Sequence, residues 1–411
     1  MNKLMKKIVT VALALTMVMS TVLSVSATGL QQDDPETGTL TKILEVPKGV
    51  PTPDKTFNFV FTKSGIVNGS GVLDSADAVK ATMPGLSNVS TTFGTSDTST
   101  TETVAGYWDV TKTITDIVPT STTWPHAGEY VYMVSELQDS PADPALRYSL
   151  ASYQMTVYVE NTAPSDPNGN LIVKNIGFKQ FINDAGTTAD IPAKADPIFR
   201  NRYKELVKLD ISKMVTGQYA DATLGFVFTP TFERALDKDE VISIGTIIGA
   251  DGTPTSRIVT VTFAANGTTG VADPTTFTLA HGETIKFEGV NSSDTEKFGK
   301  GTLPIGTTWT VMETGSAGYT ASAIVNNNSA TEEGPFPTSP GTAGANLTVN
   351  TDGTNALIAG LSINKAAFTN EYRTVSPTGI LLNNLPFILL IVVALGGFVG
   401  YIASKRRKAT N

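Results

Sequence analysis

Cysteine is absent from the sequence, which excludes disulfides, thiolate metal ligands and a cysteine nucleophile. Histidine is scarce: His126 and His281 are the only two, and both lie in turn-like contexts. A metal site or a Ser-His arrangement is therefore not expected, and we expect no cofactor. The glycine-rich segment 301–306 lacks the lysine and hydroxyl pair of a phosphate-binding loop. We therefore predict a protein that is not an enzyme.

Basic clusters are also missing, apart from the last residues of the chain, and the net charge of −8 argues against nucleic acid as a partner. Asp166, Asn168 and Asn170 could together hold a calcium ion, but turn chemistry explains these three residues better. The negative charge is interpreted as a contribution to solubility.

Long amphipathic helical patterns are missing too, whereas threonine, valine, glycine and serine are abundant up to Thr378. Asn-Gly and Asp-Gly turn signals recur at 68–69, 168–169, 251–252, 266–267 and 352–353. With a length of 411 residues, these features predict an all-β protein of two tandem Ig-like β-sandwich domains in an elongated rod.

Long apolar runs occur only at the two ends of the chain. At the start, three lysines precede an apolar run over 8–23 and small residues follow, so 1–27 is predicted to be a secretory signal peptide. At the other end, 385–403 is long enough to span a bilayer as a transmembrane helix. The basic tail 404–411 is predicted to stay in the cytoplasm.

Between these ends, a set of three residues occurs twice in the same order: a lysine in an opening strand, a glutamate in a middle strand and an asparagine in a closing strand. The first triad is Lys42, Glu136 and Asn201, and the second triad is Lys213, Glu313 and Asn370.

All six residues lie in alternating patterns that place them with apolar neighbours on one face of a strand. Lys42, for example, shares its face with Leu40 and Leu44. Both asparagines stand in the pattern Phe-x-Asn-x-Tyr, at 199–203 and 368–372. The repetition favours buried, functional residues over ordinary surface residues, which is the simpler interpretation of any one of the six taken alone.

Buried ionisable groups need partners or a reaction, because an unpaired buried ion is strongly disfavoured. A lysine kept as a free amine is a nucleophile, and a protonated glutamic acid can donate a hydrogen bond to the asparagine amide oxygen. Attack on the amide carbon would expel ammonia and leave a Lys–Asn isopeptide bond. The proximity that folding imposes makes this single-turnover step plausible without an external enzyme. We therefore predict the crosslinks Lys42–Asn201 and Lys213–Asn370, promoted by Glu136 and Glu313.

Nearly the whole chain resembles the Gram-positive major (backbone) pilins with intramolecular isopeptide bonds, and is most similar to the two-domain streptococcal T-antigen type. In the first half the resemblance rests on 128–136 and the strand region 148–159; in the second it rests on 303–313 followed by Gly318 and Tyr319. It implies two pilin domains, and the repeated residue sets place them over 37–203 and 204–372, almost without a linker.

The segment 375–379, Val-Ser-Pro-Thr-Gly, precedes the apolar run and resembles a sortase sorting signal, in which cleavage occurs between Thr378 and Gly379. It departs from the common Leu-Pro-x-Thr-Gly signal, because Val375 and Ser376 hold the first two places. The T-antigen type also departs from it, with a proline directly before the threonine, and this implies a dedicated pilin sortase. A plain single-pass membrane protein is the alternative.

The resemblance also implies an acceptor lysine just ahead of the first isopeptide asparagine, and Lys194 occupies that place. By residue parity, Lys194 is expected to face outward, in phase with Arg200 and Arg202. Lys174 and Lys179 are competing candidates.

Two functional classes follow from the resemblance. The first is the structural shaft subunit of a covalent pilus, secreted and anchored at the cell wall, with a pilin-polymerising sortase, other copies of itself, accessory pilins and peptidoglycan as partners. It would be associated with the membrane only before sorting. The second is a wall-anchored adhesin or surface protein built from the same domains and never polymerised.

Overall fold

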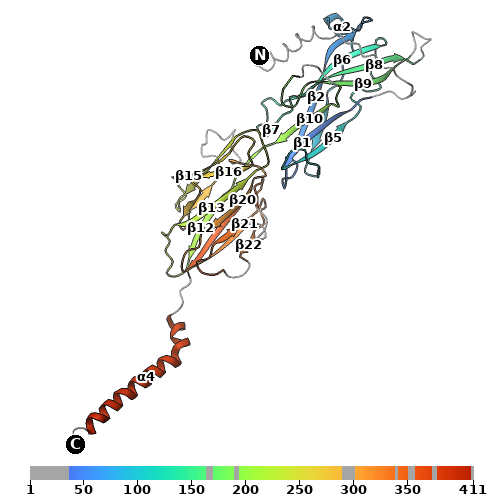
Figure 1. Cartoon of the computed structure of the whole chain (residues 1–411). Helices are drawn as coiled ribbons and strands as arrows, with labels where there is room; N and C mark the ends of the chain where they lie inside the picture. The colour runs from blue at the N-terminus through green and yellow to red at the C-terminus, as the bar shows by residue number, and fades with distance from the viewer. Residues whose placement is uncertain are drawn as a thin grey trace.

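The computed structural model describes residues 37–162, 170–188, 194–288, 301–337, 341–349, 357–372 and 377–408, the last segment with side chains only over 386–405. The predicted signal peptide, the first part of the sorting motif and all but Asn170 of the possible calcium-binding turn lie outside these residues. Within them the chain is almost entirely β-strand, arranged as two domains in a row with a C-terminal helix beyond the second (Figure 1). The predicted all-β class with two tandem sandwich domains is confirmed.

The first domain consists of two sheets that pack face to face. One sheet has the strand order β5-β1-β10-β7 and the other β3-β2-β6-β8-β9, with β4 paired to β2. A short helix, α2 (Asp77–Thr82), follows β3. The strands are β1 (Leu40–Pro47), β2 (Lys55–Val67), β3 (Leu73–Asp74), β4 (Val89–Phe93), β5 (Tyr107–Ile114), β6 (Gly128–Leu137), β7 (Leu146–Arg147), β8 (Ser152–Asn161), β9 (Leu171–Ile182) and β10 (Ile198–Tyr203).

The second domain is built mainly from one curled sheet. Its strands follow the order β22-β21-β25-β12-β18-β14-β15-β16-β13-β20-β23, with β17 on β13 and β24 on β20, and β11 pairs separately with β19. They are β11 (Leu206–Val207), β12 (Asp210–Thr216), β13 (Phe226–Glu233), β14 (Val241–Ile248), β15 (Pro254–Phe263), β16 (Thr269–Asp273), β17 (Phe277–Leu279), β18 (Thr284–Lys286), β19 (Leu303–Pro304), β20 (Thr308–Glu313), β21 (Tyr319–Asn326), β22 (Glu333–Phe336), β23 (Leu347–Val349), β24 (Leu357–Ile358) and β25 (Lys365–Tyr372).

The first long strand and the last strand of each domain lie side by side and run parallel. In the first domain β1 pairs with β10, and in the second β12 pairs with β25. Parallel neighbours cannot be joined by a tight turn, so the rest of each domain forms the connection between them. Among the described strands, those before Tyr203 pair only with one another, and so do those after Leu206. We keep 37–203 and 204–372 as proposed domain limits.

The core of each domain is aromatic. In the first, Phe199 on β10 packs against Phe59, with ring centroids 4.9 Å apart. In the second, Phe368 on β25 packs edge-on against Phe228 at 5.1 Å. All four side chains are buried, and such pairs are typically worth about 1 kcal/mol beyond the burial of their area. In the last strand of each domain, the phenylalanine two residues before the asparagine thus packs into the core.

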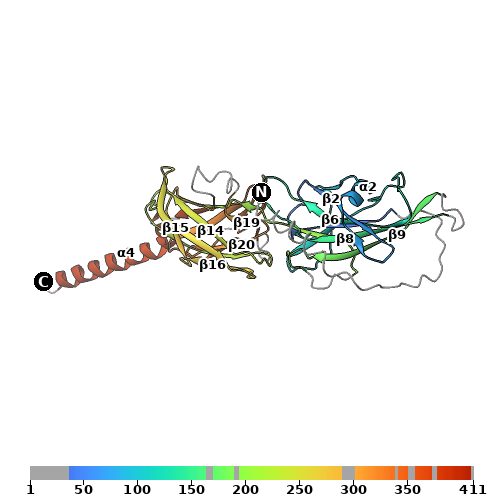
Figure 2. The ribbon, with the colours of Figure 1, turned by 90° about the horizontal axis from the view of Figure 1, so that it is seen from above.

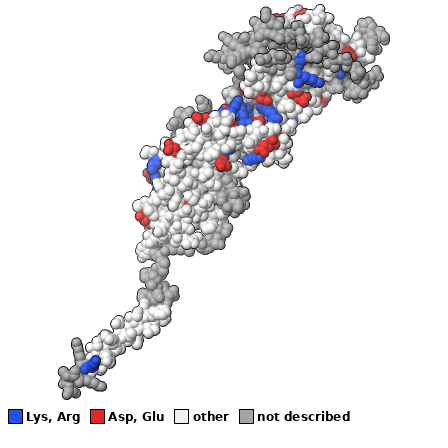
Figure 3. Space-filling view, viewed as in Figure 1, with Lys and Arg blue, Asp and Glu red and all other residues white. Residues whose placement is uncertain are grey.

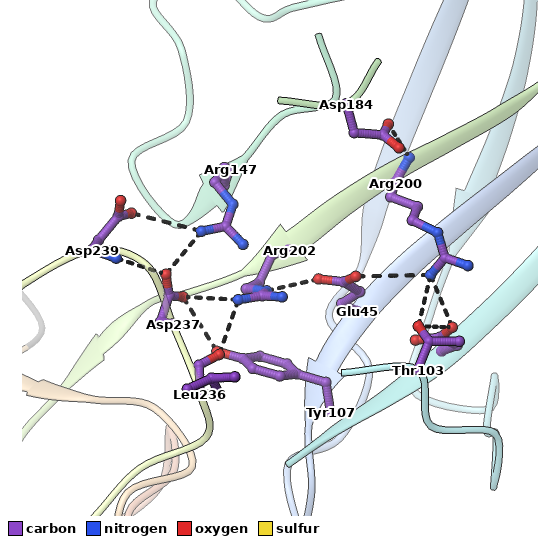
Figure 4. A network of polar contacts seen from close by, with 11 residues as sticks. Glu45, Thr103, Tyr107, Arg147, Asp184, Arg200, Arg202, Leu236, Asp237 and Asp239 are labelled. Atoms are coloured by element: carbon purple, nitrogen blue, oxygen red, sulfur yellow. Dashed lines mark hydrogen bonds and ion pairs between the residues drawn. The ribbon is translucent and has the colours of Figure 1, made fainter. Parts of the chain in front are cut away.

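A polar network joins the two domains (Figure 4). Arg202 on β10 is buried, donates from Nε to Glu45 at 2.7 Å and lies 3.5 Å from Asp237 of the second domain. Arg147 donates to the same aspartate at 2.8 Å. Burial favours the neutral acid, but these arginines and a backbone N–H hold the pKa of Asp237 below its ordinary value. Figure 3 shows charged side chains gathered over this junction.

Close backbone contact also restricts the junction. Gly106 has a φ of +86°, and a Cβ there would lie 2.6 Å from the Cβ of Ala235 in the second domain. The N–H of Leu236 donates to Ala105 O at 3.3 Å. These contacts hold 105–106 of the first domain directly against 235–236 of the second.

The C-terminal helix α4 (Pro377–Lys408) extends away from the second domain, at the end opposite the first domain (Figure 2). Within it, Pro386–Lys405 has a mean hydropathy of 2.4 and its apolar side chains are exposed. This helix is long and apolar enough to cross a membrane.

Candidate functional site

The first triad is assembled in the centre of the first domain, between its two sheets. Lys42 Nζ donates to Glu136 Oε2 at 2.7 Å, and Asn201 Nδ2 donates to Glu136 Oε1 at 2.5 Å. The side chains of the lysine and the glutamate are fully inaccessible to solvent. One carboxyl group therefore touches both the amine and the amide.

Strand pairing explains this meeting. In the parallel pair β1–β10, Lys42 lies opposite Phe199 and Leu44 lies opposite Asn201, so the lysine and the asparagine are two positions apart on one sheet face. Glu136 comes from β6 in the opposing sheet, where it pairs with Phe59. The triad thus connects the first strand, the last strand and the facing sheet.

The second triad repeats the arrangement. Lys213 Nζ donates to Glu313 Oε1 at 2.8 Å and to its Oε2 at 3.0 Å, and Asn370 Nδ2 donates to Oε1 at 2.5 Å. The side chains of the lysine and the glutamate are again fully inaccessible. Lys213 lies opposite Phe368 in the parallel pair β12–β25, as Lys42 lies opposite Phe199.

An aromatic ring lies close to each of the two lysine amines. Lys42 Nζ lies 4.4 Å from the ring centroid of Phe57, and Lys213 Nζ lies 4.2 Å from that of Phe226. Burial lowers the pKa of each lysine to about 8, although the neighbouring glutamate opposes this shift. Burial also raises the pKa of Glu136 and of Glu313. Both shifts increase the population of the state with a free amine beside a neutral acid, relative to the same groups in water.

The two amide oxygens differ. Asn201 Oδ1 accepts a hydrogen bond from the backbone N–H of Ser149 at 2.6 Å, whereas Asn370 Oδ1 is buried without a hydrogen-bond partner. In both triads the glutamate contacts the amide nitrogen. The sequence predicts that the glutamic acid donates to the amide oxygen, but in the first triad that oxygen accepts the N–H of Ser149.

The remaining predicted residues lie apart from the triads. Lys194 is exposed and forms an isolated antiparallel bridge with Lys179, which is also exposed, and Lys174 lies nearby on β9 with an exposed side chain. Thr378 and Gly379 lie in the first turn of α4, and Val375 and Ser376 are outside the described residues.

Both histidines contact the backbone, and His281 does so on β12, the strand that carries Lys213. His281 Nδ1 accepts the N–H of Val215 at 3.0 Å, and His126 contacts the carbonyl of Ala127 at 2.9 Å. In the described part of the chain, no three acidic, histidine or cysteine side chains gather in a way that could hold a metal ion.

Sequence reasoning missed Ser149 and Asp184, which border the first triad. Ser149 contacts Asn201 through its backbone N–H, and the residue type gives no sign of a backbone contact. Asp184 lies in a turn after β9, where an aspartate is explained by turn chemistry alone.

Comparison with known proteins gives one family match and several similar structures. Residues 207–372 match a family described as a domain of unknown function (DUF7601). No curated protein matches the sequence.

The solved structures that the chain resembles include the major pilin of Streptococcus pyogenes, at 20% identity and a TM-score of 0.32, covering 81% of this chain and 97% of that one. The T3.2 major pilin of the same species is 18% identical, with a TM-score of 0.33 and coverage of 82% and 99%. A pilus-presented adhesin is 20% identical, with a TM-score of 0.23 and coverage of 54% and 36%.

Proposed function

We propose that this protein is the structural shaft subunit of a sortase-assembled covalent pilus on a Gram-positive cell surface, and that each of its domains is closed by an autocatalytic Lys–Asn isopeptide bond. The observation that carries the crosslinking is the contact of one buried carboxyl with a lysine amine and an asparagine amide, present in both domains. Burying a lysine and a glutamate together is costly, and a reaction between the lysine and the asparagine gives this arrangement a use.

The reaction balances without any co-reactant. The free amine of the lysine attacks Cγ of the asparagine, and a bond from Nζ to Cγ forms. The glutamate takes a proton from the attacking nitrogen and delivers it to Nδ2, since its two oxygens contact both groups. The Cγ–Nδ2 bond then breaks and ammonia leaves. Because each domain holds its own reactants, the step happens once per triad.

The polymerising part of the proposal rests on the ends of the chain. The sorting-like segment before the apolar helix would give sortase an acyl group at Thr378, and the exposed Lys194 would supply the amine of the next subunit. The signal peptide would export the chain, and the apolar helix would hold it in the membrane until sortase transfers it. Peptidoglycan and accessory pilins would then complete the anchored fibre.

The mass of the protein tests the crosslinks. Residues 28–378, produced without any enzyme partner, are expected to weigh less than their sequence by two ammonia molecules. Glu136→Ala and Glu313→Ala should each restore one ammonia, because each variant removes the carboxyl that moves the proton. Intact-mass spectrometry of the three proteins measures this directly.

A matched control comes from a surface carboxylate. Glu102 contacts an exposed lysine, Lys48, at 2.6 Å, so Glu102→Ala also breaks a Lys–Glu contact but leaves both triads intact. It should keep the full deficit of two ammonia molecules. A folded wild-type protein with no deficit would refute the isopeptide proposal.

Acid should slow both reactions. Below the raised pKa of the glutamate, the pair holds two protons and the lysine remains an unreactive ammonium. Protein purified unfolded in denaturant and diluted into buffers between pH 4 and pH 8 should lose ammonia slowest in acid, and faster as the pH rises toward 8. An equal rate in acid, with folding followed by tryptophan fluorescence, would contradict the free-amine mechanism.

The alternative is a wall-anchored adhesin or surface protein that is never polymerised. The same triads would serve it, so the mass deficit does not distinguish the two. A ladder of SDS-resistant high-mass species in wall extracts supports the pilus, whereas a single anchored species supports the alternative.

A further inference from the structure

The two triads have different surroundings at the atom where negative charge would develop. The N–H of Ser149, a residue only 3% exposed, points at Asn201 Oδ1 at 2.6 Å. In the second triad, Asn370 Oδ1 is buried and has no donor among the described residues. A buried N–H aimed at a reacting carbonyl oxygen is the geometry of an oxyanion hole.

The path of the backbone explains the difference. In the first domain, β7 is two residues long, and its ladder with β10 ends at the pair Arg147–Arg202. The chain then turns toward β8, so the N–H of Ser149 is free of the ladder and reaches the side chain of Asn201. In the second domain, β21 continues along β25 past Asn370, with Ala321 directly opposite. Its backbone groups are engaged in the sheet.

Asp184 fixes the position of this donor. One of its carboxylate oxygens, Oδ1, accepts hydrogen bonds from the Ser149 hydroxyl and from the Arg200 N–H, the latter at 2.9 Å. Its backbone carbonyl accepts the N–H of Leu150 at 3.2 Å. Figure 4 shows Asp184 beside the backbone of Arg200. Since Arg200 directly precedes Asn201, one carboxylate holds both the donor residue and the strand that carries the amide.

We infer that the backbone N–H of Ser149 is the donor that stabilises the oxyanion at Asn201, and that Asp184 is the residue that positions it. This inference rests on the proposed crosslinking and deepens it. The electrons of the carbonyl move onto Oδ1 when Lys42 Nζ attacks, and the N–H of Ser149 holds that charge until ammonia leaves. Glu136 is then needed only for proton transfer.

The second triad must work differently. Without a backbone donor, Asn370 Oδ1 must be stabilised by a proton from Glu313. Rotation of the Asn370 amide by half a turn would place Oδ1 against the Glu313 carboxyl, where Nδ2 lies now. The second reaction therefore requires Glu313 as an acid, whereas the first tolerates Glu136 as a carboxylate.

The test compares both crosslinks in the same molecule. The full chain is purified unfolded, diluted into detergent buffer, quenched over time and digested, and the two linked peptides are quantified. Ser149→Pro removes the N–H and should slow the Lys42–Asn201 crosslink on the order of 100-fold, as loss of one oxyanion donor does in enzymes. Ser149→Ala keeps the N–H and should slow it far less. The Lys213–Asn370 crosslink should be unchanged in both.

Asp184 supplies variants that do not alter the backbone at Ser149. Asp184→Ala should slow the first crosslink, and Asp184→Asn, which keeps an oxygen acceptor, should restore most of the rate. Equal slowing by both would assign the effect to the charge of Asp184 near Lys42 and Glu136 and would overturn the positioning role.

The pH profile distinguishes a catalytic donor from a structural contact. Above about 8, where the lysines lose their protons, the first crosslink should stay fast, while the second should slow because its glutamate is ionised. The charged groups that influence the first amine are Glu136, Asp184 and Glu45, and among the described residues Glu313 is the one that influences the second. In Ser149→Pro the first crosslink should acquire the alkaline decline of the second.

The outcomes separate the inference from the function on which it rests. If neither linked peptide forms in the wild type, the proposed crosslinking fails. If both form and Ser149→Pro slows neither, or if the two wild-type profiles coincide at alkaline pH, the crosslinking stands and the oxyanion role of Ser149 is wrong.

Discussion

Pulling the protein between Lys194 and Thr378 is expected to give no unfolding step in the wild type and one large step in Glu313→Ala. The variant lacks the crosslink that closes the second domain, so the segment between Lys213 and Asn370 becomes extensible. Its release should add on the order of 500 Å, since an extended chain spans about 3.3–3.6 Å per residue. Single-molecule force spectroscopy with handles at these two positions measures it.

The strand order supplies the reason. Force enters β25 at Tyr372 and reaches Asn370 two residues later, where the crosslink transfers it to Lys213 in the neighbouring β12. It then follows the backbone of β12 toward β10. The crosslink connects β25 directly to β12. The strands that lie between these two in the sequence therefore carry no load. We expect the contacts of Arg202 with Glu45 and Asp237 to keep the two domains aligned under this load.

Glu136→Ala is the matched control for this experiment. It removes the first crosslink, but only 194–201 of the loop from Lys42 to Asn201 lies between the two handles, so no step of second-domain length should appear. An unfolding event of that length in fully crosslinked protein would contradict the load path. The same loops suggest a stabilisation of roughly 5 kcal/mol per crosslink, by the chain-entropy estimate made for disulfides.

The buried triads could be predicted from the sequence because their alternation is regular. Each lysine, glutamate and asparagine stands among apolar residues two apart, and the structure buries all six with those neighbours. The fold class followed from the same patterns and from the turn residues. Both depend on local periodicity, which a single sequence carries.

Parity was a poor guide where a second domain covers a strand. By alternation Arg202 was expected to face solvent, but it is 6% exposed, because Glu45 and Asp237 enclose it at the junction. Nothing local to β10 indicates that another domain packs there. The proposed role of Ser149 could not be predicted for the same reason. Its N–H is positioned by the end of the β7–β10 pairing and by Asp184, which is distant in the sequence.

Polymerisation is expected to stop completely in Lys194→Ala. If the amine of this residue receives the threonine acyl group of the next subunit, its loss removes the only nucleophile for chain growth, and the ladder of high-mass species should collapse to a monomer band. Lys194 is exposed and lies apart from both triads, so the variant should fold, lose two ammonia molecules and remain anchored. Immunoblots of wall extracts, together with the intact mass of the monomer, measure both properties.

The neighbouring Lys179 provides a matched control for this experiment. Lys179 and Lys194 are partners in an isolated antiparallel β-bridge, and both are exposed. Lys179→Ala therefore removes a neighbouring exposed amine. If attachment depends on the position just ahead of β10, Lys179→Ala should leave the ladder unchanged. A ladder that persists in Lys194→Ala, with the branch located by tandem mass spectrometry on Lys179 or Lys174, would move the acceptor to β9. Load would then enter the first domain through β9 instead of β10, and the sheet β3-β2-β6-β8-β9 would have to bear it.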